Sequence, residues 1–128
     1  MSNRNKAIVR RTVEEIWNQG NFAIINERFA SDYIVHAMAD VNGREGEKHF
    51  AAALRTAFPD LHYTIEDEIA EGDRVVHRWT ASGTHQGEFQ GILPTGGPVK
   101  ITGISVYRVA NGKMVEGWTS TDMLGLRK

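Results

Sequence analysis

Apolar residues recur with helical spacing in the first half of the chain. Three helices are predicted, over residues 5–18, about 23–29 and about 44–58. In the first of them, Val9, Val13 and Ile16 are separated by four and three residues and therefore share one face. Pro59 ends the third helix, because proline cannot donate the backbone hydrogen bond that a continuing helix needs. A short strand is expected over residues 33–36.

Beyond residue 60 the apolar positions alternate with polar ones, which is the period of a strand with one buried face. The alternating apolar residues are Leu61, Tyr63, Ile65 and Ile69. A turn at residues 71–73 leads into a second strand over 75–83, so an antiparallel hairpin is predicted. The pairing set by this turn places Asp67 opposite Arg78. We expect the pair to share a face with Ile65, Ile69 and Val76.

Residues 99–110 and 113–121 predict a second hairpin around Asn111-Gly112, and two registers are open. A two-residue turn pairs Ala110 with Lys113 and places Trp118 beside Ser105 and Tyr107. A three-residue turn with a glycine bulge pairs Val109 with Lys113 instead. That register aligns Tyr107, Ser105 and Gly103 with Val115, Gly117 and Thr119, respectively.

Helices followed by long strands predict an α+β fold. We expect one curved, mostly antiparallel sheet with the three helices of the amino-terminal half on its concave side. Such a cone encloses an apolar pocket, which favours a small hydrophobic ligand. Residues 1–128 are expected to form a single domain, because a chain of this length builds one core.

Composition narrows the possible classes of function. The chain has no cysteine, which excludes disulfides, thiolate metal sites and cysteine nucleophiles. It has 15 basic and 16 acidic residues and a formal net charge of -1, so nucleic acid is not an expected partner. No apolar run approaches the roughly 20 residues of a membrane span, and the amino-terminal residues lack the apolar core of a signal peptide. We therefore expect a cytoplasmic protein that does not bind membranes.

A few residues are candidates for chemistry. His36 ends the short apolar strand near the expected cone and is either catalytic or structural. Asp67 and Arg78 are expected to form a cross-strand ion pair, as a structural bridge or as a polar anchor in the pocket. His85 ends a strand near the expected pocket mouth, and its alternative is a solvated loop position. Three aromatic residues either pack in the core or form a platform for a ligand. They are Trp17, Tyr33 and Tyr107.

Other chemistries find no support in the motifs. The five histidines show no paired metal-ligand spacing, so no metal site is expected. The chain has no nucleophile elbow, phosphate loop or dinucleotide fingerprint.

Several segments, in order along nearly the whole chain, resemble one family. They are residues 15–21 (EIWNQGN), 31–36 (SDYIVH), 43–46 (GREG), 57–61 (AFPDL), 70–80 (AEGDRVVHRWT), 83–87 (GTHQG), 91–96 (GILPTG) and 107–118 (YRVANGKMVEGW). With these segments the chain resembles the SnoaL-like polyketide cyclase (ester cyclase) family of the nuclear transport factor 2-like superfamily.

The resemblance implies a cone-shaped α+β barrel that dimerises through its sheet. It also implies aldol-type ring closure of an aromatic polyketide without metal or cofactor. In that family an aspartate acts as acid and base, with a histidine and a glutamine on the neighbouring strand. Counted from the turn at Gly112, these positions carry Thr119, Ser105 and Gly103 here, none of which can be the base. The small side chains are expected to enlarge the pocket, and the family's pocket positions favour the bulged register.

The leading hypothesis is a cofactor-independent, cyclase-type enzyme that acts on a small hydrophobic carbonyl compound. A rearranged set of His36, Asp67 and Arg78, together with His85, would carry the chemistry. The alternatives are a non-catalytic ligand-binding protein, or a lyase, isomerase or hydrolase on the same fold. We expect His36 to line the main cavity as general acid and base, and Thr119 to face the same cavity.

A homodimer is also expected, because so large an apolar area on one face of a sheet favours burial against a second copy. The outer-face residues of this prediction are Val75, Trp79, Ile104, Val106, Met114 and Trp118.

Overall fold

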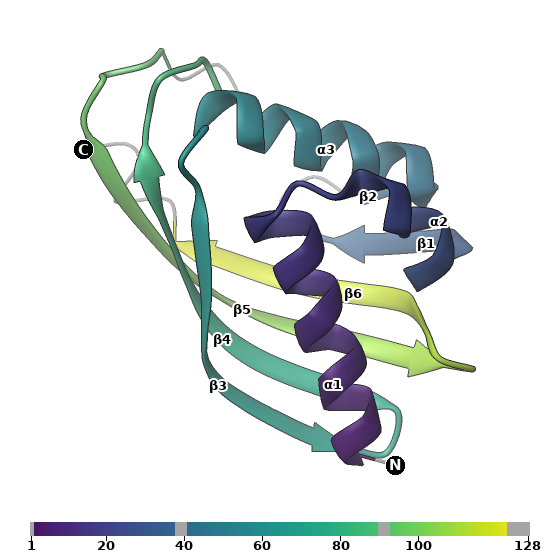
Figure 1. Cartoon of the computed structure of the whole chain (residues 1–128). Helices are drawn as coiled ribbons and strands as arrows, with labels where there is room; N and C mark the ends of the chain where they lie inside the picture. Colours follow the sequence, from purple (N-terminus) through teal and green to yellow (C-terminus); the bar gives the residue numbers. More distant parts are fainter. Residues whose placement is uncertain (1, 38–40, 90–92, 123–128) are drawn as a thin grey trace.

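Two layers make up the fold. The computed structural model describes residues 2–37, 41–89 and 93–122. Its helices lie against the concave side of one strongly curved sheet, and the core fills the space between the two layers (Figure 1). This arrangement confirms the predicted α+β class, with the helices drawn from the first half of the chain.

The helical segments start near the predicted residues but are less regular than predicted. They are α1 (Ser2–Val13), the π-helical turn η1 (Glu14–Asn18), the 3-10 turn η2 (Phe22–Ile24), α2 (Ile25–Arg28) and α3 (Gly43–Ala57). The π-helical turn brings the Asn18 side chain to the backbone of Tyr63 at the edge of the sheet. There it accepts a hydrogen bond from the N–H at 2.6 Å and donates one to the C=O at 2.9 Å. No helix in these described ranges has the length and apolar character to cross a membrane.

In the part of the chain that the structure describes, six strands form one mixed sheet in the order β2-β1-β6-β5-β4-β3. The strands are β1 (Phe29–His36), β2 (Val41–Asn42), β3 (His62–Glu71), β4 (Arg74–Thr84), β5 (Pro98–Ala110) and β6 (Lys113–Asp122). Strand β1 runs parallel to β6, and the other neighbouring pairs are antiparallel. The sequence pattern missed β2 and the first residues of β1, whereas it placed the other strands within about two residues.

The hairpin of β5 and β6 follows neither predicted register along its whole length. The turn Asn111-Gly112 has two residues, with φ values of 53° and 77°, and pairs the residues that flank it. A β-bulge then shifts the pairing, so that Ser105 lies opposite Thr119. The register favoured by the resemblance, which aligned Ser105 with Gly117, is therefore wrong by two residues. A shift of two residues keeps each side chain on its face, so the predicted grouping of Ser105 with Thr119 is confirmed.

A second bulge, in β3, decides which of its side chains face the core. Asp67 pairs with Arg78 as predicted, and the ion pair spans 2.7 Å. Between Ile65 and Asp67 the pairing shifts by one residue. Ile65 therefore packs against the core, and its predicted position on the face of the ion pair is wrong. Beyond the bulge Glu68 faces inward and accepts a hydrogen bond from Arg10 at 2.8 Å.

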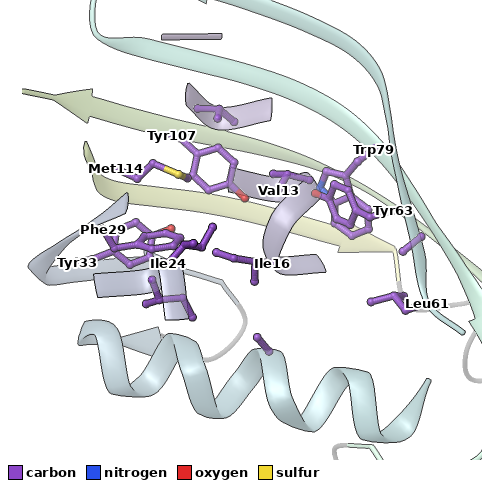
Figure 2. Packing of buried hydrophobic residues seen from close by; sticks show 14 of the residues in the cluster. Val13, Ile16, Ile24, Phe29, Tyr33, Leu61, Tyr63, Trp79, Tyr107 and Met114 are labelled. Atoms are coloured by element: carbon purple, nitrogen blue, oxygen red, sulfur yellow. The ribbon is translucent and has the colours of Figure 1, made fainter. Parts of the chain in front are cut away.

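Aromatic side chains fill much of the space between the helices and the sheet (Figure 2). Phe29 and Tyr33 pack edge to face with their ring centroids 4.5 Å apart, and Tyr63 stacks on Trp79 at 5.0 Å. The Trp79 indole lies directly over Gly103, where an added Cβ would be 2.3 Å from Cζ2 of the indole. The expectation that Gly103 enlarges the pocket is therefore wrong, because the indole occupies that space.

The outer face of the sheet carries a row of mostly apolar side chains across five strands. Cross-strand pairing aligns Ile69, Val76, Val106, Trp118 and His36. Ile69 is 66% exposed, and Ile104, two residues from this row, is 51% exposed. The predicted outer-face positions of Val75, Trp79 and Met114 are wrong, since all three are buried. Alternation along β4 turns the first two toward the helices, and Met114 precedes the β6 bulge that reverses the faces.

Candidate active site

A carboxyl group lies in the core between α3 and the sheet. Glu47 is one helical turn before Ala51, on the side of α3 that packs against the sheet, and only 5% of it is exposed. Burial raises the pKa of its carboxyl from 4.5 to about 7. Its Oε2 atom has no hydrogen-bond partner among the residues that the structure describes. A carboxyl group with this pKa can both take up and return a proton near neutral pH.

Two tyrosines of the sheet are buried in the interior, Tyr33 on β1 and Tyr107 on β5 (Figure 2). Burial raises the pKa of both phenols, and the electrostatic effect of Glu47 adds to the rise. Gly117 makes room for both rings, because an added Cβ would lie 2.8 Å from the Tyr33 hydroxyl and 3.1 Å from Cδ1 of Tyr107. The two phenols stay protonated at neutral pH and can donate hydrogen bonds to a developing negative charge.

Hydroxyl groups of the sheet continue the polar surface beside Tyr107. The Trp79 indole N–H donates to the Ser105 hydroxyl at 2.9 Å, and the hydroxyls of Ser105 and Thr119 are 3.0 Å apart. Both hydroxyls interact with the Tyr107 phenol and oppose part of the rise in its pKa. The predicted inward direction of Thr119 is thereby confirmed, in contact with Ser105.

A buried imidazole, that of His77, also lies beside Tyr107. His77 on β4 is fully buried, its Nε2 lies 3.2 Å from the Tyr63 hydroxyl, and its ring packs edge to face against Tyr107 at 5.2 Å. Burial lowers the pKa of the His77 ring to about 4, so the ring is neutral at neutral pH. Its Nδ1 atom has no hydrogen-bond partner in the described parts of the chain. Tyr107 therefore contacts the ring of His77 and is influenced by the charge of Glu47, and each of these two buried groups has one unpaired polar atom.

The structure places His36 on the outer face of the sheet. Its Nε2 lies 2.8 Å from the Glu116 carboxylate, and this hydrogen bond lowers the pKa of that carboxyl. The prediction that the ring lines the main cavity is wrong. Because side chains alternate along β1, Tyr33 and Val35 face inward whereas His36 faces outward.

The other predicted site residues are spread over the molecule. Asp67 and Arg78 lie on the outer face with both side chains more than half exposed, so their pair bridges strands outside the core. His85 is fully buried and stacks on Phe58 at 5.1 Å, which excludes the alternative of a solvated loop histidine. Trp17 is half-buried and stacks on the Tyr63 ring at 6.4 Å. The predicted residues that come together in the interior are Tyr33, Tyr107, Ser105 and Thr119.

Sequence reasoning missed Glu47 and His77 as candidate site residues. Glu47 lies three residues before Phe50, on the predicted apolar side of the third helix. His77 occupies the inward position between Val75 and Trp79 in β4. A titratable residue on an otherwise apolar face is uncommon, and this signal could have found both.

The family of the chain follows from comparison with known proteins. The model of the SnoaL-like polyketide cyclase family matches residues 7–128. The chain belongs to this family. A candidate SnoaL-like polyketide cyclase from Jannaschia sp. CCS1 is 27% identical and has a TM-score of 0.89, with 98% of this chain and 90% of that protein covered.

Two further solved structures are similar to this SnoaL-like protein. AclR, a candidate hydroxylase from Streptomyces galilaeus, is 31% identical with a TM-score of 0.87, covering 98% of this chain and 94% of that one. A candidate polyketide cyclase from Acidithiobacillus ferrooxidans is 30% identical with a TM-score of 0.84, covering 97% and 92%. Comparison with curated proteins gives no match. Since these relatives carry two different candidate activities, the reaction has to be argued from the site.

Proposed function

We propose that this SnoaL-like protein catalyses proton transfer at a carbon next to a carbonyl group, with Glu47 as general acid and base. The reaction would be an aldol-type ring closure of a small hydrophobic carbonyl compound. The observation that carries the proposal is the buried Glu47 carboxyl, with a pKa near neutrality and an unpaired oxygen. The family resemblance implies an aspartate at position 119. This chain has Thr119 there, and a threonine side chain does not ionise near neutral pH. We infer that α3 supplies the carboxyl group that position 119 of β6 lacks.

The proposed reaction balances with side-chain groups alone, so it requires no cofactor. The Glu47 carboxylate removes a proton from the carbon, the C–H electron pair forms the enolate double bond, and the carbonyl π pair moves to oxygen. The phenols of Tyr33 and Tyr107 stabilise that oxygen by donating hydrogen bonds. The enolate carbon then attacks a second carbonyl carbon of the same molecule and forms the ring bond. Protonated Glu47 returns its proton to the new alkoxide oxygen.

The outer-face residues take no part in this proposal. His36, Asp67 and Arg78 lie on the opposite side of the sheet from Glu47, and a strand separates a side chain on one face from a substrate on the other. His85 lies in a separate aromatic contact with Phe58. We therefore propose no catalytic role for these four residues.

Deuterium exchange tests the first half of the reaction. Ethyl benzoylacetate, an aromatic keto ester, has an acidic CH2 group whose exchange in D2O is followed by proton NMR. We expect the wild-type protein to accelerate this exchange, and Glu47→Gln to slow the accelerated rate by at least about 100-fold, since glutamine cannot take up the proton. The matched control is Glu45→Gln on the same helix, whose wild-type side chain is 78% exposed, and it should keep the wild-type rate.

Two results would contradict the proposal. A wild-type rate in Glu47→Gln would show that another group is the base. A wild-type protein that binds the ester without accelerating exchange would favour the alternative of a non-catalytic ligand-binding protein.

We also propose that two copies of the chain pair through the outer face of the sheet. The row of mostly apolar side chains crosses five strands, and Ile69 at its end and Ile104 beside it are more than half exposed. Sedimentation at micromolar concentration should give a dimer, and Ile104→Asp should give a monomer. Ala53→Asp, on the exposed side of α3, is the control and should leave the dimer intact. A monomeric wild-type protein would refute this assembly.

A further inference from the structure

We propose that His77 is a further catalytic residue, whose Nδ1–H donates a hydrogen bond to the carbonyl oxygen of the substrate while Glu47 removes the neighbouring proton. This inference rests on the proposed function and deepens it. It defines the substrate as an enolisable carbonyl compound whose oxygen is held by the sheet and whose acidic carbon faces the helix layer.

The hydrogen bonding of the His77 ring carries the first step of the argument. The Nε2 atom is 3.2 Å from the Tyr63 hydroxyl, and we assign the hydroxyl as the donor in this contact. A neutral imidazole has a single N–H, so the proton is then on Nδ1. That N–H is buried and has no acceptor among the described residues. Buried donors without acceptors are uncommon in folded proteins, which points to an oxygen atom of a ligand.

The position of His77 relative to Glu47 is the second step. The imidazole comes from β4 and contacts the Tyr107 ring, and the carboxyl comes from α3 and acts on the Tyr107 phenol through its charge. Their unpaired atoms, Nδ1 of His77 and Oε2 of Glu47, are therefore both buried on the inner side of the sheet. Proton removal next to a carbonyl needs this division of labour, because the base acts on carbon while a donor stabilises the charge on oxygen.

The charge state of His77 is the third step. Burial lowers the pKa of the ring to about 4, so His77 is a neutral donor at neutral pH. A neutral ring does not form an ion pair with the Glu47 carboxylate and leaves it free to act as base. Neutral imidazoles polarise substrate carbonyl groups in this way in other enzymes.

A hollow of the surface lies beside Tyr63, the hydrogen-bond partner of this ring. This hollow has a volume of about 260 Å³ and lies between strand β3 and the helical segment made of the end of α1 and η1. Its lining includes Val13, Asn18, Tyr63 and Ile65. Tyr63 thus lines the hollow, while its hydroxyl contacts the His77 ring. The phenol of Tyr63 separates the buried imidazole from this hollow and holds its Nε2 atom.

Exchange kinetics test the catalytic role of His77. In the ethyl benzoylacetate assay, His77→Leu should slow the accelerated exchange by about 100-fold, the usual effect of removing one donor to a developing oxyanion. His77→Gln, whose amide N–H can donate, should recover at least about tenfold of that loss. His49→Leu on α3 is the exposed histidine control and should keep the wild-type rate. Melting temperatures identify any variant whose loss of rate reflects unfolding.

Nitrogen NMR of histidine-labelled protein gives a readout that does not depend on turnover. The His77 signals, assigned by their loss in His77→Gln, should show a protonated Nδ1 and an unprotonated Nε2. The Nδ1 signal should shift on saturation with ethyl benzoylacetate. Tyr63→Phe, which lacks the hydroxyl, should relax the preference for this tautomer.

The outcomes separate the two proposals. Loss of exchange in Glu47→Gln with a wild-type rate in His77→Leu would overturn the role of His77 and leave the proposed function standing. Exchange that depends on neither residue would refute the proposed function and the catalytic role of His77 together. An unprotonated Nδ1, or an Nδ1 signal that the ester does not shift, would overturn the proposed hydrogen bond regardless of the kinetics.

Discussion

Replacing Glu47 with glutamine should change how the stability of the protein depends on pH. Burial raises the pKa of this carboxyl in the folded state from 4.5 to about 7. Below about pH 4 the folded and unfolded states both bind the proton. Between about pH 4.5 and 7 the unfolded chain releases it while the folded protein keeps it, so the free energy of unfolding falls as the pH rises. Above that range both states are ionised and the loss is complete.

The size of the effect follows from the two pKa values. The interval from 4.5 to about 7, at about 1.4 kcal/mol per pH unit, corresponds to about 3 kcal/mol. Because glutamine does not ionise, the variant lacks this contribution. The stability of Glu47→Gln relative to the wild type should therefore increase by about 3 kcal/mol between pH 4 and pH 8. Any cost of burying the amide is the same at every pH and does not enter this change.

Urea unfolding followed by tryptophan fluorescence measures this difference at a series of pH values from 4 to 8. Glu45→Gln provides the control, because it removes a carboxyl from the exposed side of the same helix. Its stability relative to the wild type should change by less than about 0.5 kcal/mol over the range. If Glu47→Gln were equally insensitive to pH, the carboxyl would not be held neutral in the core, and its assignment as acid and base would fail.

Two other substitutions test the packing and the faces of the sheet. Gly103→Ala should destabilise the protein by about 1–3 kcal/mol in thermal unfolding, because the added Cβ would lie 2.3 Å from Cζ2 of Trp79. It should also shift the tryptophan fluorescence, since the indole would lose its hydrogen bond to Ser105; an unchanged melting temperature and spectrum would contradict the described packing. His36→Ala should leave the deuterium exchange rate unchanged, because its ring faces Glu116 on the outer side of the sheet. A tenfold loss of rate in that variant would show that the outer face reaches the substrate.

Much of the fold was predictable from local patterns. The change from helical spacing to alternation near residue 60 separates the helices from the long strands, because each period reports one buried face. The turn at residues 71–73 is short enough to set the pairing of its strands, so Asp67 was correctly placed opposite Arg78. The quoted segments were also sufficient to identify the family, which residues 7–128 match.

Only the tertiary structure decided which side chains face the interior. One extra residue in β3 and one in β6 reverse the faces of Ile65 and Met114, and nothing in the local pattern marks either bulge. The same holds for the site. The sequence shows Glu47 and His77 as single polar residues on apolar faces, whereas their loss of contact with water comes from the packing of α3 against β1 and of α1 against β3 and β4. A carboxyl pKa depends on the atoms around the group in space, which is why the base of the proposed reaction emerged only from the folded chain.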